Sequence, residues 1–137
     1  MLFNTMAMTT EEMRSGIETL CGKDSEMKEI HSYLDKVADW PVGDTFQLMI
    51  LIDELKKRMK DEVTHFSFRK KDGTVRQAYG TRVSEVIVRY EGALLPPQNQ
   101  RQQQRSGGTF PYFDIEKRAW RCFKVESLMD IDRGYTI

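Results

Sequence analysis

The sequence of 137 residues is poor in the residue types that build disulfide scaffolds and membrane spans. Its two cysteines, Cys21 and Cys122, are too few for a disulfide framework, so a reduced, cytoplasmic interior is expected. The longest apolar run, residues 48–52, falls well short of the roughly 18 apolar residues that a membrane span needs. Residues 1–10 contain no basic segment, and we therefore expect no secretory signal.

Residues that catalyse reactions and bind metals are equally scarce. The two histidines, His31 and His65, accompany no Gly-x-Ser-x-Gly or Cys–His signature. Two cysteines and two histidines at wide spacings give no paired metal-ligand motif, and no glycine-rich phosphate loop precedes a helix and lysine. Cys122, between Arg121 and Phe123, is expected to be a buried, inert thiol. The sequence therefore predicts a protein that is not an enzyme and has no metal or cofactor.

An excess of charge of either sign is also lacking, since 21 basic residues balance 21 acidic ones. The balance conceals an asymmetry. Residues 1–55 contain 4 basic and 11 acidic residues, a net charge of −7, whereas residues 56–137 contain 17 basic and 10 acidic residues, a net charge of +7. The two parts could attract each other, the basic part could meet a polyanion, or the asymmetry could be solvated and functionally silent.

The first 60 residues have the apolar period of helices. Thr9 and Glu12 have capping-box spacing and predict a helix that runs to about Cys21, with Gly22 as its C-terminal stop. Residues 25–37 repeat apolar positions at helical spacing and predict a second, shorter helix.

A third helix is predicted over residues 45–60, because Asp44 followed by Gln47 is another capping signature. The first part of this helix is apolar nearly all round, which favours burial on more than one side. If a small domain leaves part of it uncovered, the helix is expected to form a dimer or to bind a protein partner. The interaction surface predicted there consists of Leu48, Leu51, Ile52 and Leu55.

From residue 62 the period changes from about 3.6 to 2, which is typical of strands. Phe66 and Phe68 alternate with polar residues, and Asp72-Gly73 is a strong hairpin signal. A two-residue loop at Asp72-Gly73 would place Phe66 opposite Tyr79. Tyr79 would then share the buried face of the hairpin with both phenylalanines.

The middle of this half contains one predicted strand and one predicted loop. Residues 83–90 (VSEVIVRY) are β-branched and alternating, and we interpret them as a further strand. Residues 93–108 contain Pro96-Pro97 followed by QNQRQQQRSGG, which predicts a flexible surface loop. Such a loop is either disordered or follows a phosphate backbone with its arginines.

A second hairpin is predicted from residues 110–115 and 119–125. With a two-residue loop near residues 117–118, Asp114 would lie opposite Arg121. Residues 128–131 then add a short closing turn or strand.

Two segments resemble a known family: HFSFRKKDGTVRQAYGTR (residues 65–82) and YFDIEKRAWRCFKVESLMDI (residues 112–131). They are similar to a WYL-related family of small uncharacterised bacterial and phage proteins with an Sm-like or SH3-like β-barrel. The resemblance implies a small barrel over residues 61–137 and does not extend to the N-terminal helices. Together with the helical region predicted over residues 1–60, this barrel gives an α+β protein. One departure is Arg118, which stands where a glycine is expected and requires either a positive φ or a different turn.

The resemblance also implies binding of nucleic acid or nucleotides through basic residues of the barrel, and it brings no catalytic residue. We interpret Tyr79, Trp120 and Phe123 as core residues rather than as platforms for bases. Two functions remain open: a regulatory or phage accessory factor that acts on nucleic acid, and an interaction or assembly module that forms oligomers or binds a protein. Either is expected in a bacterial or phage-infected cytoplasm, away from membranes. The predicted nucleic-acid-binding residues are Arg69, Lys70, Lys71, Arg76, Arg82, Arg121 and Lys124.

Overall fold

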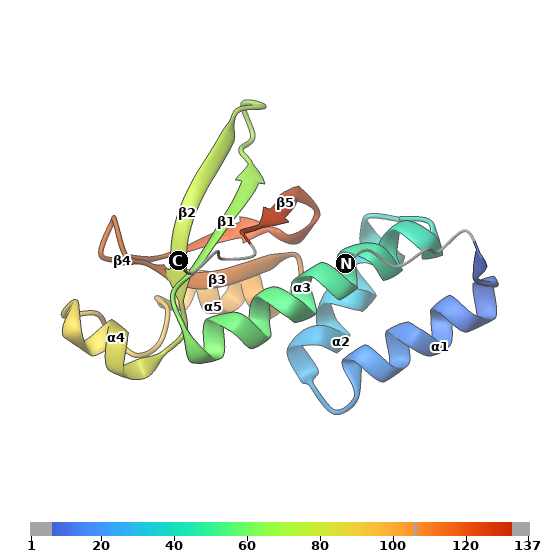
Figure 1. Cartoon of the computed structure of the whole chain (residues 1–137), viewed down its shortest axis with the longest axis horizontal. Coiled ribbons are helices and arrows are strands. Elements are labelled where there is room, and N and C mark those ends of the chain that lie inside the picture. The colour runs from blue at the N-terminus through green and yellow to red at the C-terminus, as the bar shows by residue number, and fades with distance from the viewer. Residues whose placement is uncertain (1–6, 106, 133–137) are drawn as a thin grey trace.

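The chain forms three helices followed by an antiparallel sheet of five strands in the computed structural model, which describes residues 7–105 and 107–132 (Figure 1). The opening helices are α1 (Thr10–Cys21), α2 (Ser25–Ser32), its π-helical continuation η2 (Tyr33–Val37) and α3 (Val42–Asp61). The strands are β1 (Thr64–Arg69), β2 (Val75–Thr81), β3 (Thr109–Asp114), β4 (Ala119–Lys124) and β5 (Leu128–Ile131). The predicted α+β class is confirmed; residues 1–6 and 133–137 of the two predicted regions lie outside the described residues.

The sheet curls into a barrel. Its strands pair in the order β4-β3-β2-β1-β5, so β1 and β4 are three strand spacings apart, about 14 Å in a flat sheet. Yet the ring centroids of Phe68 on β1 and Phe123 on β4 are 5.2 Å apart, and those of Phe66 and Phe123 are 5.4 Å apart. Strong curvature therefore brings these strands around a common aromatic interior, and the 3-10 turn η3 (Val125–Ser127) links β4 to β5.

The predicted caps of α1 are confirmed. The Thr9 hydroxyl accepts a hydrogen bond from the Glu12 backbone N–H, and the Glu12 carboxylate accepts one from the Thr9 N–H. Gly22 ends the helix at a φ of 49°, a conformation that glycine adopts without steric cost. α3 differs from its prediction, because it begins one turn earlier, after Pro41, and Asp44 lies within its first turn.

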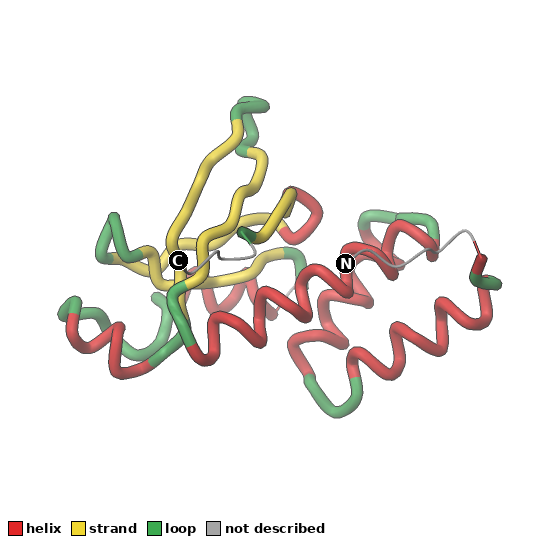
Figure 2. Tube along the Cα trace, viewed as in Figure 1, coloured by secondary structure: helices red, strands yellow, loops and turns green. Residues whose placement is uncertain are grey.

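The helices and the barrel share one core. α3 contacts both α1 and the strands, and Figure 2 shows α1 and α2 on the side of the molecule away from the sheet. Leu48, Ile52 and Leu55 are 7%, 0% and 0% exposed, and Leu51 is partly buried. The prediction of an interaction surface at these four residues is therefore wrong. The chain's own α1, α2 and strands cover them, and each fully buried side chain contributes about 2 kcal/mol to folding.

Residues 84–89 form a helix, α4 (Ser84–Arg89), and the predicted strand there is wrong. Both edges of β2 are already paired, with β1 and β3, so the segment that follows it has no free strand beside it. Val83, Ile87 and Tyr90 follow helical i, i+4, i+7 spacing, and this triplet turns Ile87 into the core at 1% exposure. Tertiary contacts outweigh the strand propensity of the β-branched residues.

The Gln-rich segment is also helical, as α5 (Gln98–Arg105), which corrects the predicted flexible loop. Pro97 supplies the first carbonyl, which accepts from the N–H groups of Gln100 and Arg101. Glutamine is a good helix former, and proline suits the start of a helix. The Gln100 amide donates to the Trp120 carbonyl at 3.1 Å, which joins α5 to β4.

The first hairpin has a three-residue loop, one residue longer than predicted. Phe66 therefore faces Ala78, and His65 faces Tyr79. Gly73 closes the loop at a φ of 90°. Because a shift of one residue exchanges the two faces of a strand, Tyr79 lies on the outside at 44% exposure and its core assignment is wrong.

The second hairpin also has a longer loop than predicted, so Asp114 lies opposite Ala119 and Arg121 lies opposite Tyr112. Arg118 has a φ of 51°, one of the two solutions that the missing glycine left open. Phe123 is in the core at 4% exposure, as predicted. Trp120 is only partly buried, and its indole N–H donates to the Ala93 carbonyl at 2.6 Å.

Candidate nucleic-acid interface

The β1–β2 hairpin projects beyond the rest of the molecule, and its end carries three consecutive basic residues (Figure 1). We call Arg69, Lys70 and Lys71 the hairpin tip; all three are exposed. The Arg69 guanidinium donates to the Gly73 carbonyl at 2.7 Å, and no ion pair within the described residues involves any of the three. The hairpin tip therefore presents unneutralised positive charge to solvent.

The turn that holds the hairpin tip is fixed by Asp72. One oxygen of its carboxylate accepts from the Thr74 backbone N–H at 2.9 Å and from the Thr74 hydroxyl at 2.6 Å. These hydrogen bonds lower the pKa of Asp72, with the charge of Lys70 assisting. An Asp-Gly turn with this bonding holds the three cations on a defined backbone.

Arg82 is not available to a ligand in the same way. Its guanidinium makes two hydrogen bonds to the Glu26 carboxylate, both 2.8 Å, and its Nε donates to the Pro111 carbonyl at 3.0 Å. It also lies 4.0 Å from the centroid of the Phe110 ring. This predicted nucleic-acid-binding residue instead joins α2 to the barrel.

Lys56 completes the same connection, with its Nζ 2.7 Å from both Asp24 and Glu26. We call Asp24, Glu26, Lys56 and Arg82 the helix–barrel joint. Burial raises the pKa of Glu26, but the hydrogen bonds and charges of Arg82 and Lys56 outweigh burial and hold the pKa at about 2. Of the interpretations that the charge asymmetry allowed, attraction between the two parts is observed at this joint.

The other basic candidates are divided. Arg76 lies 2.6 Å from the Asp114 carboxylate, which is fully buried, so Arg76 neutralises an interior charge. Arg121 and Lys124 are exposed on β4, which β3 separates from β2 in the sheet. Of the seven candidates, the structure therefore brings together the three of the hairpin tip, places two on another strand and pairs two with buried carboxylates.

A polar surface on the outside of the barrel was missed by sequence reasoning. The strand registers place side chains in two rows across β2, β1 and β5. We call this surface the polar grid; its rows are Gln77, Ser67, Asp130 and Tyr79, His65, Asp132. Recognising the three-residue loop of the first hairpin would have placed Tyr79 here, because the loop length sets the register.

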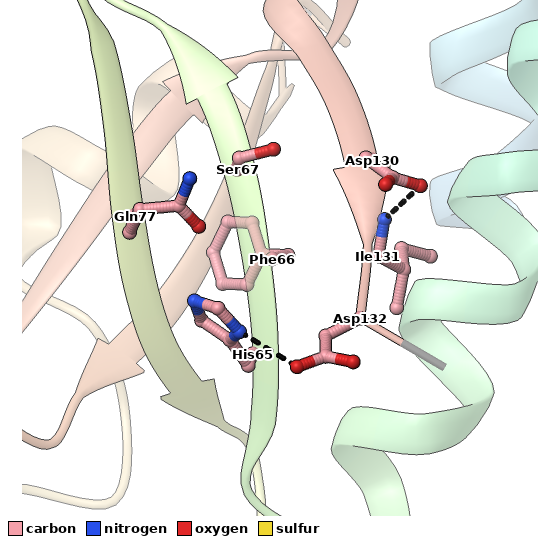
Figure 3. A pocket seen from close by; sticks show the side chains of 7 residues that line it. All are labelled: His65, Phe66, Ser67, Gln77, Asp130, Ile131 and Asp132. Atoms are coloured by element: carbon pink, nitrogen blue, oxygen red, sulfur yellow. Dashed lines mark hydrogen bonds and ion pairs between the residues drawn. The ribbon is translucent and has the colours of Figure 1, made fainter. Parts of the chain in front are cut away.

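A pocket of about 290 Å³, open to solvent, lies on the polar grid (Figure 3). Its walls are His65, Ser67, Gln77, Asp130 and Asp132, together with Phe66 and Ile131. The His65 Nδ1 lies 3.0 Å from an Asp132 carboxylate oxygen, and the His65 ring stacks on Tyr79 with centroids 4.5 Å apart. The β1–β5 register shifts between Ser67 and Phe68, a bulge of the kind that re-aims side chains next to binding sites.

Comparison with known proteins identifies the barrel. Residues 52–129 match the model of the WYL_2 family, described as having an Sm-like SH3 β-barrel fold. The chain belongs to the WYL_2 family. An uncharacterised 11.5 kDa protein in the Gp31-cd intergenic region of Enterobacteria phage T4 is 28% identical over 88 residues, which are 64% of this chain and 83% of that protein. No solved structure matches the chain significantly.

The WYL_2 match includes the hairpin tip and most of the polar grid, but it begins within α3 and leaves out α1 and α2.

Among the described residues, no cluster of three or more Cys, His, Asp or Glu side chains is placed to hold a metal ion. Burial raises the pKa of the Cys21 and Cys122 thiols, which disfavours the reactive thiolate. None of the helices described in this WYL_2 chain is long and apolar enough to span a bilayer.

Proposed function

We propose that the chain is a non-enzymatic nucleic-acid-binding protein and that the hairpin tip contacts the phosphate backbone. The observation that carries the proposal is the run of three exposed cations, Arg69, Lys70 and Lys71, at the end of a projecting hairpin and outside every ion pair described. Lysine and arginine that neutralise phosphates release counterions, which supplies sequence-independent affinity.

The division of the basic residues supports this role for the hairpin tip. Arg76 and Arg82 are occupied by buried carboxylates, so they are left out of the proposed interface. Arg121 and Lys124 are exposed and would contact a ligand long enough to reach β4. The alternative function, an assembly module, loses the apolar helix surface on which it depended, because that surface is buried within the chain.

The relative in phage T4 is the reason that the proposal assigns this binding to phage-infected bacteria, as an accessory or regulatory factor. A small protein that binds phosphates without reading many base edges suits such a role, since it acts at many sites on a nucleic acid.

The test compares two double variants of equal charge. K70A/K71A removes two cations of the hairpin tip, whereas K28A/K36A removes two exposed lysines of the α2–η2 region. Binding of labelled single-stranded DNA, double-stranded DNA and RNA is measured by fluorescence anisotropy between about 50 and 200 mM salt. We expect K70A/K71A to weaken binding about tenfold and to reduce the slope of log K against log salt by about 1.5, because two phosphate contacts are lost.

The K28A/K36A control should retain the affinity and salt slope of the unchanged protein. Equal losses in both variants would mean that net charge alone governs binding, and would contradict a specific interface. Light scattering on the same samples examines the alternative: a mass that rises with concentration, together with no binding to any of the three nucleic acids, would replace the proposed function by assembly.

A further inference from the structure

The polar grid contains hydrogen-bonding groups that the fold itself does not use. Within the described part of the chain, neither the Ser67 hydroxyl nor the Gln77 amide makes a hydrogen bond, although both line the pocket. One oxygen of Asp130 accepts from the Ile131 N–H at 2.9 Å, and this exposed carboxylate makes no other hydrogen bond among those residues. An acceptor pair and two donors thus meet in one row, Gln77–Ser67–Asp130.

We propose that this pocket binds a guanine base of a single-stranded nucleic acid whose phosphates lie along the hairpin tip. The inference rests on the proposed function and gives it a base preference. Guanine presents two adjacent donors, N1–H and N2–H, on its pairing edge, and a carboxylate accepts both at once. The Asp130 carboxylate provides that acceptor pair, while Gln77 and Ser67 can donate to guanine O6 and N7.

The other bases fit the row less well. Adenine and cytosine each offer a single amino group beside a ring acceptor, and that acceptor would face carboxylate oxygens. Inosine, which lacks the N2 amino group, loses one of the two hydrogen bonds to Asp130. The expected preference is therefore for guanine over adenine and over inosine.

The electrostatics of the pocket favour a base over a phosphate. Asp130 and Asp132 both line it, and their negative charge repels an anion. His65, held by Asp132 and stacked on Tyr79, forms an aromatic wall beside which a planar base can lie.

The proposed phosphate site at the hairpin tip and the proposed base site in the pocket are close enough for one nucleic-acid strand to occupy both. Arg69 lies two residues after Ser67 on β1 and on the same face, a separation of about 7 Å. A nucleotide in the pocket would therefore direct its neighbouring phosphates toward the hairpin tip. An arginine side chain of a protein partner would suit the same acceptors, but the three cations of the tip would repel a basic peptide.

The experiment uses labelled 12-nucleotide oligothymidine in which one central position is dG, dA or deoxyinosine. We expect the dG oligonucleotide to bind the full chain about tenfold more tightly than the other two, the discrimination typical of one bidentate contact. Asp130→Asn should reduce the preference to less than about twofold, because an amide offers one acceptor in place of the two that guanine requires. The matched control, Asp35→Asn, removes an exposed carboxylate from η2 and should leave the preference intact.

Free guanosine separates the two proposals, since it has no phosphate. Its addition should shift the amide NMR signals of Ser67 and Gln77 and not those of α1. Equal affinity for the three oligonucleotides would overturn the guanine pocket and leave the proposed function standing. Absence of binding to all three single-stranded oligonucleotides would overturn the guanine pocket, and the measurements with double-stranded DNA and RNA would then decide about the proposed function. If N-acetylarginine amide shifts the NMR signals of Ser67 and Gln77 and guanosine does not, the guanine pocket is overturned in favour of a site for a protein partner.

Discussion

The helix–barrel joint and the hairpin tip both contain arginine and lysine, but their surroundings are opposite. At the joint, Arg82 is paired with Glu26, and only 20% and 9% of these side chains are exposed. At the tip, Arg69 donates to a backbone carbonyl, and Lys70 and Lys71 extend into solvent. Positive charge therefore holds the molecule together in one region and is exposed to solvent in the other.

The comparison shows why a count of charges did not separate the basic residues that are paired within the fold from those that are exposed to solvent. The excess of +7 after residue 55 includes both kinds, and they are distinguished by which acidic residues lie beside them in space, such as Glu26 of α2 and Asp114 of β3. A buried carboxylate such as Glu26 requires a cation, because desolvated charge is costly without a partner. Arginine, with its planar fork of donors, suits that position.

The largest expected effect comes from breaking the joint. Arg82→Ala removes the guanidinium that pairs with the Glu26 carboxylate, and it also removes the contacts with Pro111 and Phe110. We expect the free energy of unfolding to fall by about 4 kcal/mol, the usual consequence of removing one partner of a buried pair. Urea denaturation measures the change.

The same variant sharpens the comparison when nucleic-acid affinity is measured below the unfolding transition. Arg82→Ala should bind as well as the unchanged protein, since its cation is directed inward. An affinity loss as large as that of the tip variant would contradict the division into structural and binding cations.

The next effect depends on pH. Glu26 has a pKa of about 2 in the folded chain against an ordinary value of 4.5, so the unfolded state takes up its proton first as the pH falls. The stability that this ionised group contributes is complete above about pH 4.5 and is lost as the pH falls toward 2. The loss amounts to about 3 kcal/mol.

Glu26→Gln tests this assignment, because it removes the titrating group while preserving its shape. The variant should be less stable at neutral pH and should lose about 3 kcal/mol less than the unchanged protein between pH 5 and pH 2. Parallel stability curves for the two proteins over this range would show that other carboxylates cause the acid sensitivity.

Local signals in the sequence predicted the helical region well. The reciprocal hydrogen bonds of Thr9 and Glu12, and Gly22 after the last turn, depend on neighbours within four residues. The aromatic alternation at Phe66 and Phe68 likewise located a strand. Where these local preferences agree with tertiary packing, sequence reasoning is sufficient.

The candidate site was predicted only in part, because it depends on register and on distant partners. The basic run of the hairpin tip is visible in the sequence, but the pairing of Arg82 with Glu26 spans 56 positions and has no local signal. A single extra loop residue moved Tyr79 from the predicted core to the polar grid. The polar grid joins β1 to β5, which are far apart in sequence, so no local pattern revealed it.

The smallest expected effect concerns the stability of the hairpin tip. In K70A/K71A, two exposed side chains outside every described ion pair are removed, so the free energy of unfolding should change by less than about 0.5 kcal/mol. Urea denaturation beside Arg82→Ala provides the contrast. A loss of 2 kcal/mol or more would show that Lys70 and Lys71 support the fold. If K70A/K71A weakens nucleic-acid binding and leaves the stability unchanged, the two regions have separate roles. The hairpin tip would then serve ligand binding, and the helix–barrel joint would serve the stability of the fold.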